Sequence, residues 1–342
     1  MIEAIGIELE FRKVYLKGEF VDTVYFGGGT PSLLSGSQLE KILDKINLLF
    51  PGKKSEITLE VNPDDLLPSK LEAWKSLGID RLSLGIQSFQ DEILKQYNRA
   101  HTARESKQAI DLGRKAGFEK FSIDLMYGFP HSDHSLWKND LSQALELDPG
   151  HISAYALTVE PKTALGNWMK KGKFMPADED FVAEQFEWLQ EQSDRLGYIQ
   201  YEISNFGKPG QFALHNTNYW KGSPYLGIGP SAHSFDGKDR GYNPSSNPGY
   251  LKSISSGNLP FVIEPLEKID QINEKILTSL RTVWGLDTDS LKVQFDLDLL
   301  KEKKGEILSF EKQGWLITQG KTLSLTRKGK LLADSIASEL FV

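Results

Sequence analysis

The chain has 342 residues, of which 39% are hydrophobic and 25% charged, and its formal net charge at pH 7 is -7. This composition is typical of a folded protein with two or three domains and excludes collagen-like, low-complexity and disordered chains. The acidic balance argues against binding to nucleic acid, and no apolar run is long enough to cross a bilayer. The first ten residues are acidic and lack the positive start of a secretory signal, so we expect a cytoplasmic protein without a membrane span.

The sequence contains no cysteine. Its residues therefore cannot form disulfides, act as thiol nucleophiles, or supply thiolate ligands to zinc or to an iron–sulfur cluster.

The N-terminal residues have the spacing of a helix, with Ile2, Ile5, Leu9 and Val14 on one face. This helix leads directly into a strand at 23–26, whereas a barrel of parallel strands normally has a strand before its first helix. Either the domain begins atypically, or a strand and its loop are missing from the N-terminus. We expect truncation or a misplaced start codon rather than a natural loss.

From Val21 to Phe206 the sequence alternates short β-rich runs with helical runs, which predicts parallel βα units. A capping box at Ser37 and Glu40 predicts the start of the first of these helices, which continues to Leu49. Six such units indicate an α/β fold with an open or partial (β/α) barrel. Strands are expected at 23–26, 56–61, 81–85, 120–125, 151–157 and 198–203, and further helices at 69–77, 103–116, 135–147 and 177–196.

Two regions follow the barrel, so the expected domains are 1–206, 207–260 and 261–342. The middle region is rich in Gly, Pro, Asn and Ser and predicts an irregular cap. The last region predicts a winged-helix-like module, and its 12 basic against 13 acidic residues argue against DNA binding. Its elements are expected as helices at 269–280, 289–295, 299–313 and 328–339, with a hairpin of strands 315–317 and 322–325.

Polar residues follow the carboxyl end of each predicted strand, where barrel enzymes place their sites. The first strand is followed by three glycines, whose bare backbone lets a ligand approach closely. Arg99 is a candidate clamp for a carboxylate. Together these groups predict a mouth that accepts an amino acid or a nucleoside. The other members are Gly28, Gly29, Thr30, Glu60, Gln87, Asp124, Thr158, Glu160 and Glu202.

Nine motifs occur in order along the chain: VYFGGGTPS, LEVNPD, RLSLGIQSF, NRAHT, IDLMYGFP, YALTVEP, YEISNF, HNTNYW and YLGIGPSAHS. They resemble the radical S-adenosylmethionine (SAM) proteins of the oxygen-independent coproporphyrinogen oxidase superfamily, and are most similar to its HemW-type heme chaperone branch. The resemblance covers nearly the whole chain. By this resemblance the residues that contact SAM are Gly28, Gly29, Thr30, Glu60, Gln87, Arg99 and Asp124, with Thr158 and His233 as looser matches.

The same resemblance implies a 4Fe-4S cluster held by a CxxxCxxC loop just before the helix with which this chain opens. The sequence lacks that loop, so we assign no metal ligand and no catalytic residue, and expect no radical chemistry from the chain as given.

The HNxxYW motif separates the heme chaperones from the oxidases of the superfamily, and here it implies a heme site at His215, Asn216, Tyr219 and Trp220. An imidazole is a good axial ligand for heme iron, and aromatic rings offer flat apolar surfaces. The expected function is to bind heme and deliver it to an acceptor protein. Packing in an irregular lid is the alternative interpretation of these four residues.

Two enzyme readings stay open. The first is a coproporphyrinogen dehydrogenase that converts propionates to vinyl groups, against which the HNTNYW motif argues. The second is an ordinary barrel enzyme without cofactors that uses Glu60 and Asp124 for acid–base chemistry. His131 and His134 have the spacing of a metal pair, but only Asp133 is nearby, so a solvated loop is expected there.

Overall fold

The computed structural model describes all 342 residues, which divide into two compact units. One unit, here called the sheet unit, comprises Tyr25–Leu33 and Ile57–Ala213. The other, here called the terminal unit, comprises Met1–Val24, Leu34–Glu56 and Leu214–Val342. The predicted domain boundaries at 206/207 and 260/261 stay predictions.

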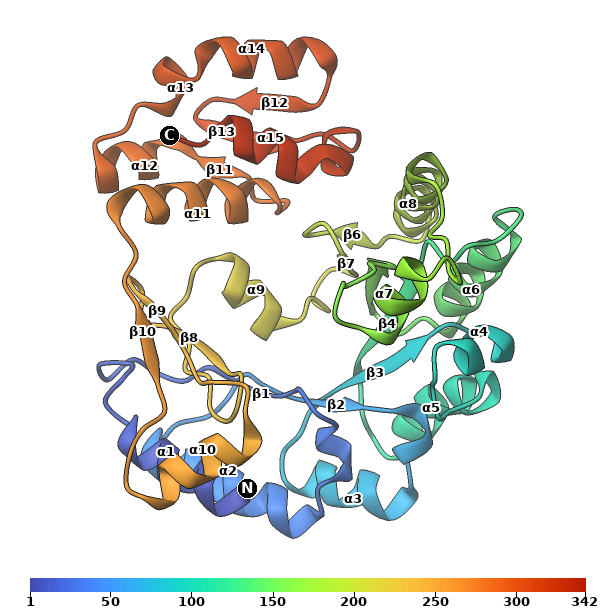
Figure 1. Cartoon of the computed structure of the whole chain (residues 1–342), viewed down its shortest axis with the longest axis vertical. Coiled ribbons are helices and arrows are strands. Elements are labelled where there is room, and N and C mark those ends of the chain that lie inside the picture. The colour runs from blue at the N-terminus through green and yellow to red at the C-terminus, as the bar shows by residue number, and fades with distance from the viewer. The chain divides into compact units, whose positions relative to one another are not determined.

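The largest sheet has seven strands in the order β1-β2-β3-β4-β5-β7-β6 (Figure 1). Strands β2 to β5 pair in parallel, and β7 and β6 complete the sheet in antiparallel register. This confirms the prediction of an α/β fold built on parallel strands. The strands are β1 (Thr23–Phe26), β2 (Glu56–Val61), β3 (Arg81–Gln87), β4 (Lys120–Tyr127), β5 (His151–Ala156), β6 (Ile199–Gln200) and β7 (Asn205–Gly207).

The predicted sixth parallel strand at 198–203 was wrong. The backbone N–H groups of Tyr201 and Glu202 both donate to the carbonyl of Asn205, so the chain reverses there and returns as β7. A β-rich run interrupted by such a turn is too short to act as a parallel crossover strand. It forms an antiparallel edge instead.

The helices of the sheet unit match the sequence pattern closely. Thr102 and Glu105 form the capping box that starts α5. Gly113 of α5 packs against Phe121 of β4 so closely that a Cβ atom on it would lie 2.6 Å from the ring. Figure 1 shows α4, α5 and α6 beside β3 and β4. The helices are α3 (Pro68–Ser76), α4 (Asp91–Gln96), α5 (Ala103–Lys115), α6 (Ser135–Leu147), α7 (Ala164–Lys170) and α8 (Glu179–Arg195), with the short 3-10 turns η1 (Pro31–Leu33) and η2 (Pro63–Asp65).

The terminal unit begins with α1 (Ile2–Phe11), which packs against α2 (Gly36–Leu49). The capping box of α2 lies two residues earlier than predicted, at Ser35 and Gln38, because Gln38 reaches the N–H of Ser35 at 2.9 Å. Glutamine serves as well as glutamate in this position.

The region predicted as an irregular cap contains two helices, α9 (Leu214–Trp220) and α10 (Asn247–Ser255). Both are short, and tertiary contacts rather than propensity stabilise helices of this length. The region also supplies β8 (His233–Phe235) and β9 (Arg240–Tyr242), which form a three-stranded antiparallel sheet with β10 (Val262–Glu264).

The C-terminal part combines helices with a three-stranded antiparallel sheet in the order β11-β13-β12. The helix predicted at 299–313 is interrupted at Lys303, and the last helix begins with a 3-10 turn. No helix of the chain is both long and apolar enough to cross a membrane. The elements are α11 (Lys268–Leu280), β11 (Leu286–Asp287), α12 (Thr288–Phe295), α13 (Leu299–Glu302), α14 (Lys304–Gln313), β12 (Leu316–Gln319), β13 (Thr322–Leu325), η3 (Gly329–Leu332) and α15 (Ala333–Glu339).

Candidate functional site

The loop after β1 is held by one carboxylate. Glu60, near the end of β2, accepts a hydrogen bond from the N–H of Gly28 at 3.0 Å and another from the hydroxyl of Tyr25 at 2.7 Å. Thr30 Oγ1 donates to the carbonyl of Gly29 at 2.8 Å. The predicted residues Gly28, Gly29, Thr30 and Glu60 therefore lie in one hydrogen-bonded group.

The three glycines of this loop are required for different reasons: the first by close packing, and the other two by their backbone conformation. A Cβ atom on Gly27 would lie 2.5 Å from the Tyr25 ring and 2.8 Å from Glu60 Oε1, so only glycine fits there. Gly28 and Gly29 have φ angles of 71° and 66°, and open space lies where their Cβ atoms would be. The loop thus presents bare backbone in a conformation that other residues rarely adopt.

Asp124, in β4, belongs to the same electrostatic group. Its pKa is raised to about 7, mainly by burial and also by the charge of Glu60, while a hydrogen bond with Ser153 and the charge of Arg99 oppose the shift. Desolvation lowers the pKa of Arg99, and the charge of Asp124 opposes that change. A cation and two carboxylates therefore influence one another at this edge of the sheet.

Gln87 and Thr158 complete the predicted set in the sheet unit. Gln87 ends β3 with a φ of 68°, next to an irregularity in the β3–β4 register. A non-glycine residue in this region of φ is uncommon and marks local strain. Thr158 is exposed and its hydroxyl makes one long hydrogen bond, 3.4 Å, to the carbonyl of Ala156.

The second group of predicted residues lies on α9 in the terminal unit. The buried carboxylate of Glu56 accepts hydrogen bonds from the N–H groups of Leu214 at 3.2 Å and His215 at 3.0 Å, and so caps the start of this helix. Thr23 Oγ1 lies 2.8 Å from His215 Nδ1. Burial lowers the pKa of His215 to about 4, so the imidazole is neutral at pH 7.

The aromatic residues of the HNTNYW motif point to different neighbours. Tyr219 meets the His215 ring edge-on, with ring centres 5.1 Å apart, and also packs against Tyr225 at 4.3 Å. The ring of Trp220 instead lies 5.4 Å from the guanidinium of Arg281, which follows α11. Asn216 is half-buried on the same helix.

His233, a looser SAM candidate, lies in β8 of the terminal unit and faces Tyr242 across the β8–β9 pair. The other SAM candidates lie in the sheet unit. His233 is exposed, and its assignment stays a prediction.

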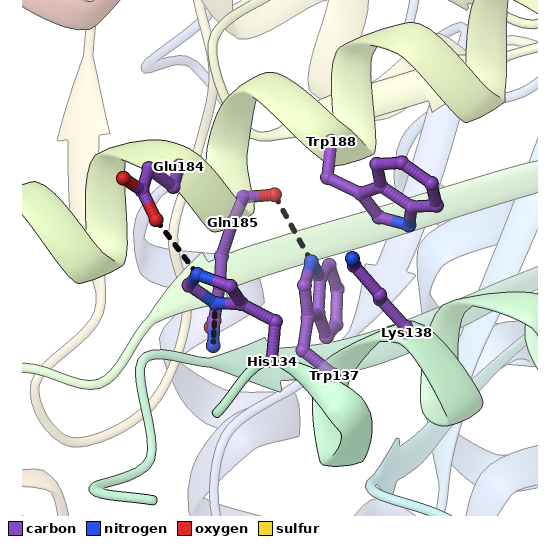
Figure 2. Close-up of a pocket in the computed structure, with 6 residues that line it drawn as sticks. All are labelled: His134, Trp137, Lys138, Glu184, Gln185 and Trp188. Carbon is purple, nitrogen blue, oxygen red and sulfur yellow. Dashed lines mark hydrogen bonds and ion pairs between the residues drawn. The ribbon is translucent and has the colours of Figure 1, made fainter. Parts of the chain in front are cut away.

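His134 lies in a small pocket between α6 and α8 (Figure 2). Its Nε2 is 2.7 Å from Glu184, and the indole N–H of Trp137 donates to the carbonyl of Gln185 at 3.0 Å. His131 contacts Asp133 in the adjoining loop. The hydrogen bonds in Figure 2 link residues of α6 and its N-terminus to α8, and Lys138 Nζ lies 4.5 Å from the centre of the Trp188 ring, so these are contacts that join two helices.

Sequence reasoning missed three residues that hold these groups in place. Tyr25 fixes Glu60, Thr23 orients His215, and Glu56 caps α9. Thr23 and Tyr25 lie two positions apart in β1, so the alternation of a strand places both side chains on the same face. A search of the first strand for polar side chains could have found these two.

Comparisons with known proteins match both the N-terminal and the C-terminal part of the chain to known families. The model of the radical SAM superfamily matches residues 7–139, and that of the HemN C-terminal domain matches residues 266–332. The heme chaperone HemW of Bacillus subtilis is 34% identical over 317 residues, which cover 92% of this chain and 84% of that protein. HemW of Haemophilus influenzae is 31% identical over 355 residues, which cover 100% of this chain and 88% of that protein.

The chain belongs to the HemW family of radical SAM proteins.

The solved structure of Escherichia coli HemN, described as a coproporphyrinogen III oxidase and radical SAM enzyme, matches with a TM-score of 0.83. It covers 99% of this chain and 82% of HemN at 22% identity, which shows a shared fold. The HemW-family chain thus has the radical SAM architecture, with helices and a small sheet at its C-terminus.

Proposed function

We propose that this chain binds heme on α9 and delivers it to an acceptor protein. Relatives with the name heme chaperone support the proposal. The observation that carries it is His215, a neutral imidazole whose Nδ1 is engaged by Thr23. When Nδ1 carries the proton and makes a hydrogen bond to Thr23 Oγ1, Nε2 carries the lone pair that would bind iron. The hydrogen bond to Thr23 also fixes the orientation of the imidazole ring.

The low pKa of His215 also favours iron binding, because protons do not compete for the ligand nitrogen near pH 7. Tyr219, whose ring touches His215, is 43% exposed and offers an apolar surface to a porphyrin. Leu214 and Tyr219 of this helix are exposed, so part of its surface is accessible to an acceptor.

We further propose that SAM occupies the strand-end group of the sheet unit. The bare backbone of Gly28 and Gly29 fits close approach of a ligand, as the open space at both positions indicates. Arg99 would bind the methionine carboxylate, and Asp124 and Glu60 would face the cationic groups of SAM. SAM, when bound, supplies a sulfonium centre that a reductant can cleave.

The residues do not fit the 4Fe-4S cluster of radical SAM proteins, because the 342 residues include no cysteine. These residues therefore offer the cluster no thiolate ligand.

Two measurements test the proposal. Titration with ferric heme should give a saturable Soret band at one equivalent, and the loaded protein should transfer its heme to apomyoglobin in excess. Absence of a saturable band, or heme that never reaches apomyoglobin, would refute the chaperone function. For SAM, calorimetry should show binding that Arg99→Ala weakens about tenfold, while the exposed control Arg104→Ala leaves it unchanged.

A further inference from the structure

The end of α9 meets the end of α11 through two pairs of a cation and an indole. The guanidinium of Arg281 lies 5.4 Å from the centre of the Trp220 ring. Lys221 Nζ lies 4.5 Å from the centre of the Trp284 ring. Two positive charges therefore adjoin the last residue of the helix that carries His215.

Two buried hydrogen-bond donors at this junction have no acceptor: the indole Nε1 of Trp220 and the Nε of Arg281. A buried donor without a partner costs free energy, and only an acceptor can remove that cost. Since both atoms are donors, they cannot satisfy each other. An anionic oxygen is the partner that this pair, with two cations beside it, would bind most strongly.

One carboxylate already contacts the junction from outside. Asp334 accepts a hydrogen bond from Arg281 NH1, and its side chain is 75% exposed. An exposed ion pair contributes little to stability. A ligand carboxylate can therefore replace Asp334 at small cost.

Heme carries two propionate carboxylates on a flat apolar ring. Lys221 lies six positions after His215, which is about 9 Å along a helix axis, a distance comparable with the reach from the iron of a heme to its carboxylates.

We propose that Lys221, Arg281 and the indole N–H of Trp220 form a clamp for the heme propionates, which displace Asp334 from Arg281. The proposal rests on the proposed heme function. It assigns a ligand-binding role to the C-terminal module, through Arg281.

The test compares ferric heme with its dimethyl ester, which lacks the carboxylate charges, by Soret titration of the full chain. Lys221→Gln with Arg281→Gln should weaken binding of heme about tenfold or more and leave affinity for the ester within twofold. The position of the Soret band should stay the same, because His215 remains the ligand. Lys301→Gln with Lys304→Gln, an equal charge change on exposed residues of the same module, is the control.

Two gentler variants keep the test decisive if the double variant does not fold. Trp220→Phe keeps an aromatic ring but removes the N–H, and should weaken heme binding about threefold. Asp334→Asn removes the competing carboxylate, and should tighten it by a similar factor.

Three outcomes would overturn the clamp: unchanged affinity for heme in the double variant, equal losses for heme and ester, or weaker binding in Asp334→Asn. If the wild-type chain binds heme with a spectrum that depends on His215, but the variants give any of these three outcomes, only the clamp fails. If the wild-type chain binds no heme, the clamp and the proposed function fail together.

Discussion

Glu56 and Glu60 belong to the same strand, β2, yet each supports a different candidate site. Glu60 holds the glycine loop of the sheet unit, whose donors lie 32 and 35 residues away in sequence. Glu56 caps α9 of the terminal unit, whose donors lie 158 and 159 residues away. The first site is built by neighbouring parallel strands, and the second by a long-range contact on a helix too short to form alone.

Glu60 completes a site that paired strands already form, whereas Glu56 fixes the start of the helix on which its site lies. The strand-end group has several independent supports, including the bulged end of β3 and the half-buried Asp124. The α9 group depends on Glu56 for its start and on Thr23 for its imidazole. Four substitutions test this difference.

The largest effect is expected for Asp124→Asn. Burial raises the pKa of Asp124 to about 7, so the folded protein keeps a proton there that the unfolded chain loses near pH 4. The free energy of unfolding of the wild type should therefore fall between about pH 4 and pH 7, by up to about 4 kcal/mol. Urea unfolding at several pH values should show that Asp124→Asn lacks this loss. If the free energy of unfolding falls equally with pH in the wild type and in Asp124→Asn, the carboxyl of Asp124 is not buried.

Glu56→Ala comes next. It leaves two backbone donors at the start of α9 without their acceptor, and should lower the free energy of unfolding by about 2 to 3 kcal/mol. The heme spectrum should change as well, because His215 loses its fixed position. Glu56→Gln keeps an acceptor and should have less than half the effect. If Glu56→Ala leaves both heme binding and the free energy of unfolding unchanged, contacts other than the Glu56 carboxylate hold the start of α9.

Glu60→Ala should reduce SAM affinity about tenfold while lowering stability by only about 1 kcal/mol, since the surrounding strands remain paired. Calorimetry with SAM measures the first effect and urea unfolding the second. The exposed Glu119→Ala, before β4 of the same sheet, is the matched control. Equal behaviour of the two variants would remove Glu60 from the site.

The smallest effect is expected for Thr23→Val. The substitution is close in shape but removes the hydrogen bond to His215 Nδ1, so heme affinity should fall about threefold through looser orientation of the ring. Thr163→Val, which removes a helix cap in the sheet unit, should leave heme binding unchanged. A Thr23→Val protein with wild-type affinity would show that the ring is oriented by other contacts.

The sequence allowed the sheet unit to be predicted because its pattern is local. Alternating runs indicated β1 to β5, and the polar residues after each strand indicated Glu60, Gln87 and Asp124. The antiparallel return of β7 was missed, since a single turn at Glu202 decides it. In the terminal unit the HNTNYW motif indicated His215, but neither α9 nor its cap at Glu56 could be predicted. Their contacts join residues more than 150 positions apart.

The most direct test of the central claim, that His215 on α9 binds heme iron, is the low-temperature electron paramagnetic resonance spectrum of the ferric heme complex. Wild-type protein should show an iron signal with nitrogen ligation, which His215→Ala abolishes and the exposed control His131→Ala retains, with both variants folded by thermal melting. An identical signal in wild type and His215→Ala, together with a lower melting temperature for that variant, would mean that His215 is a packing residue and that α9 does not bind heme iron.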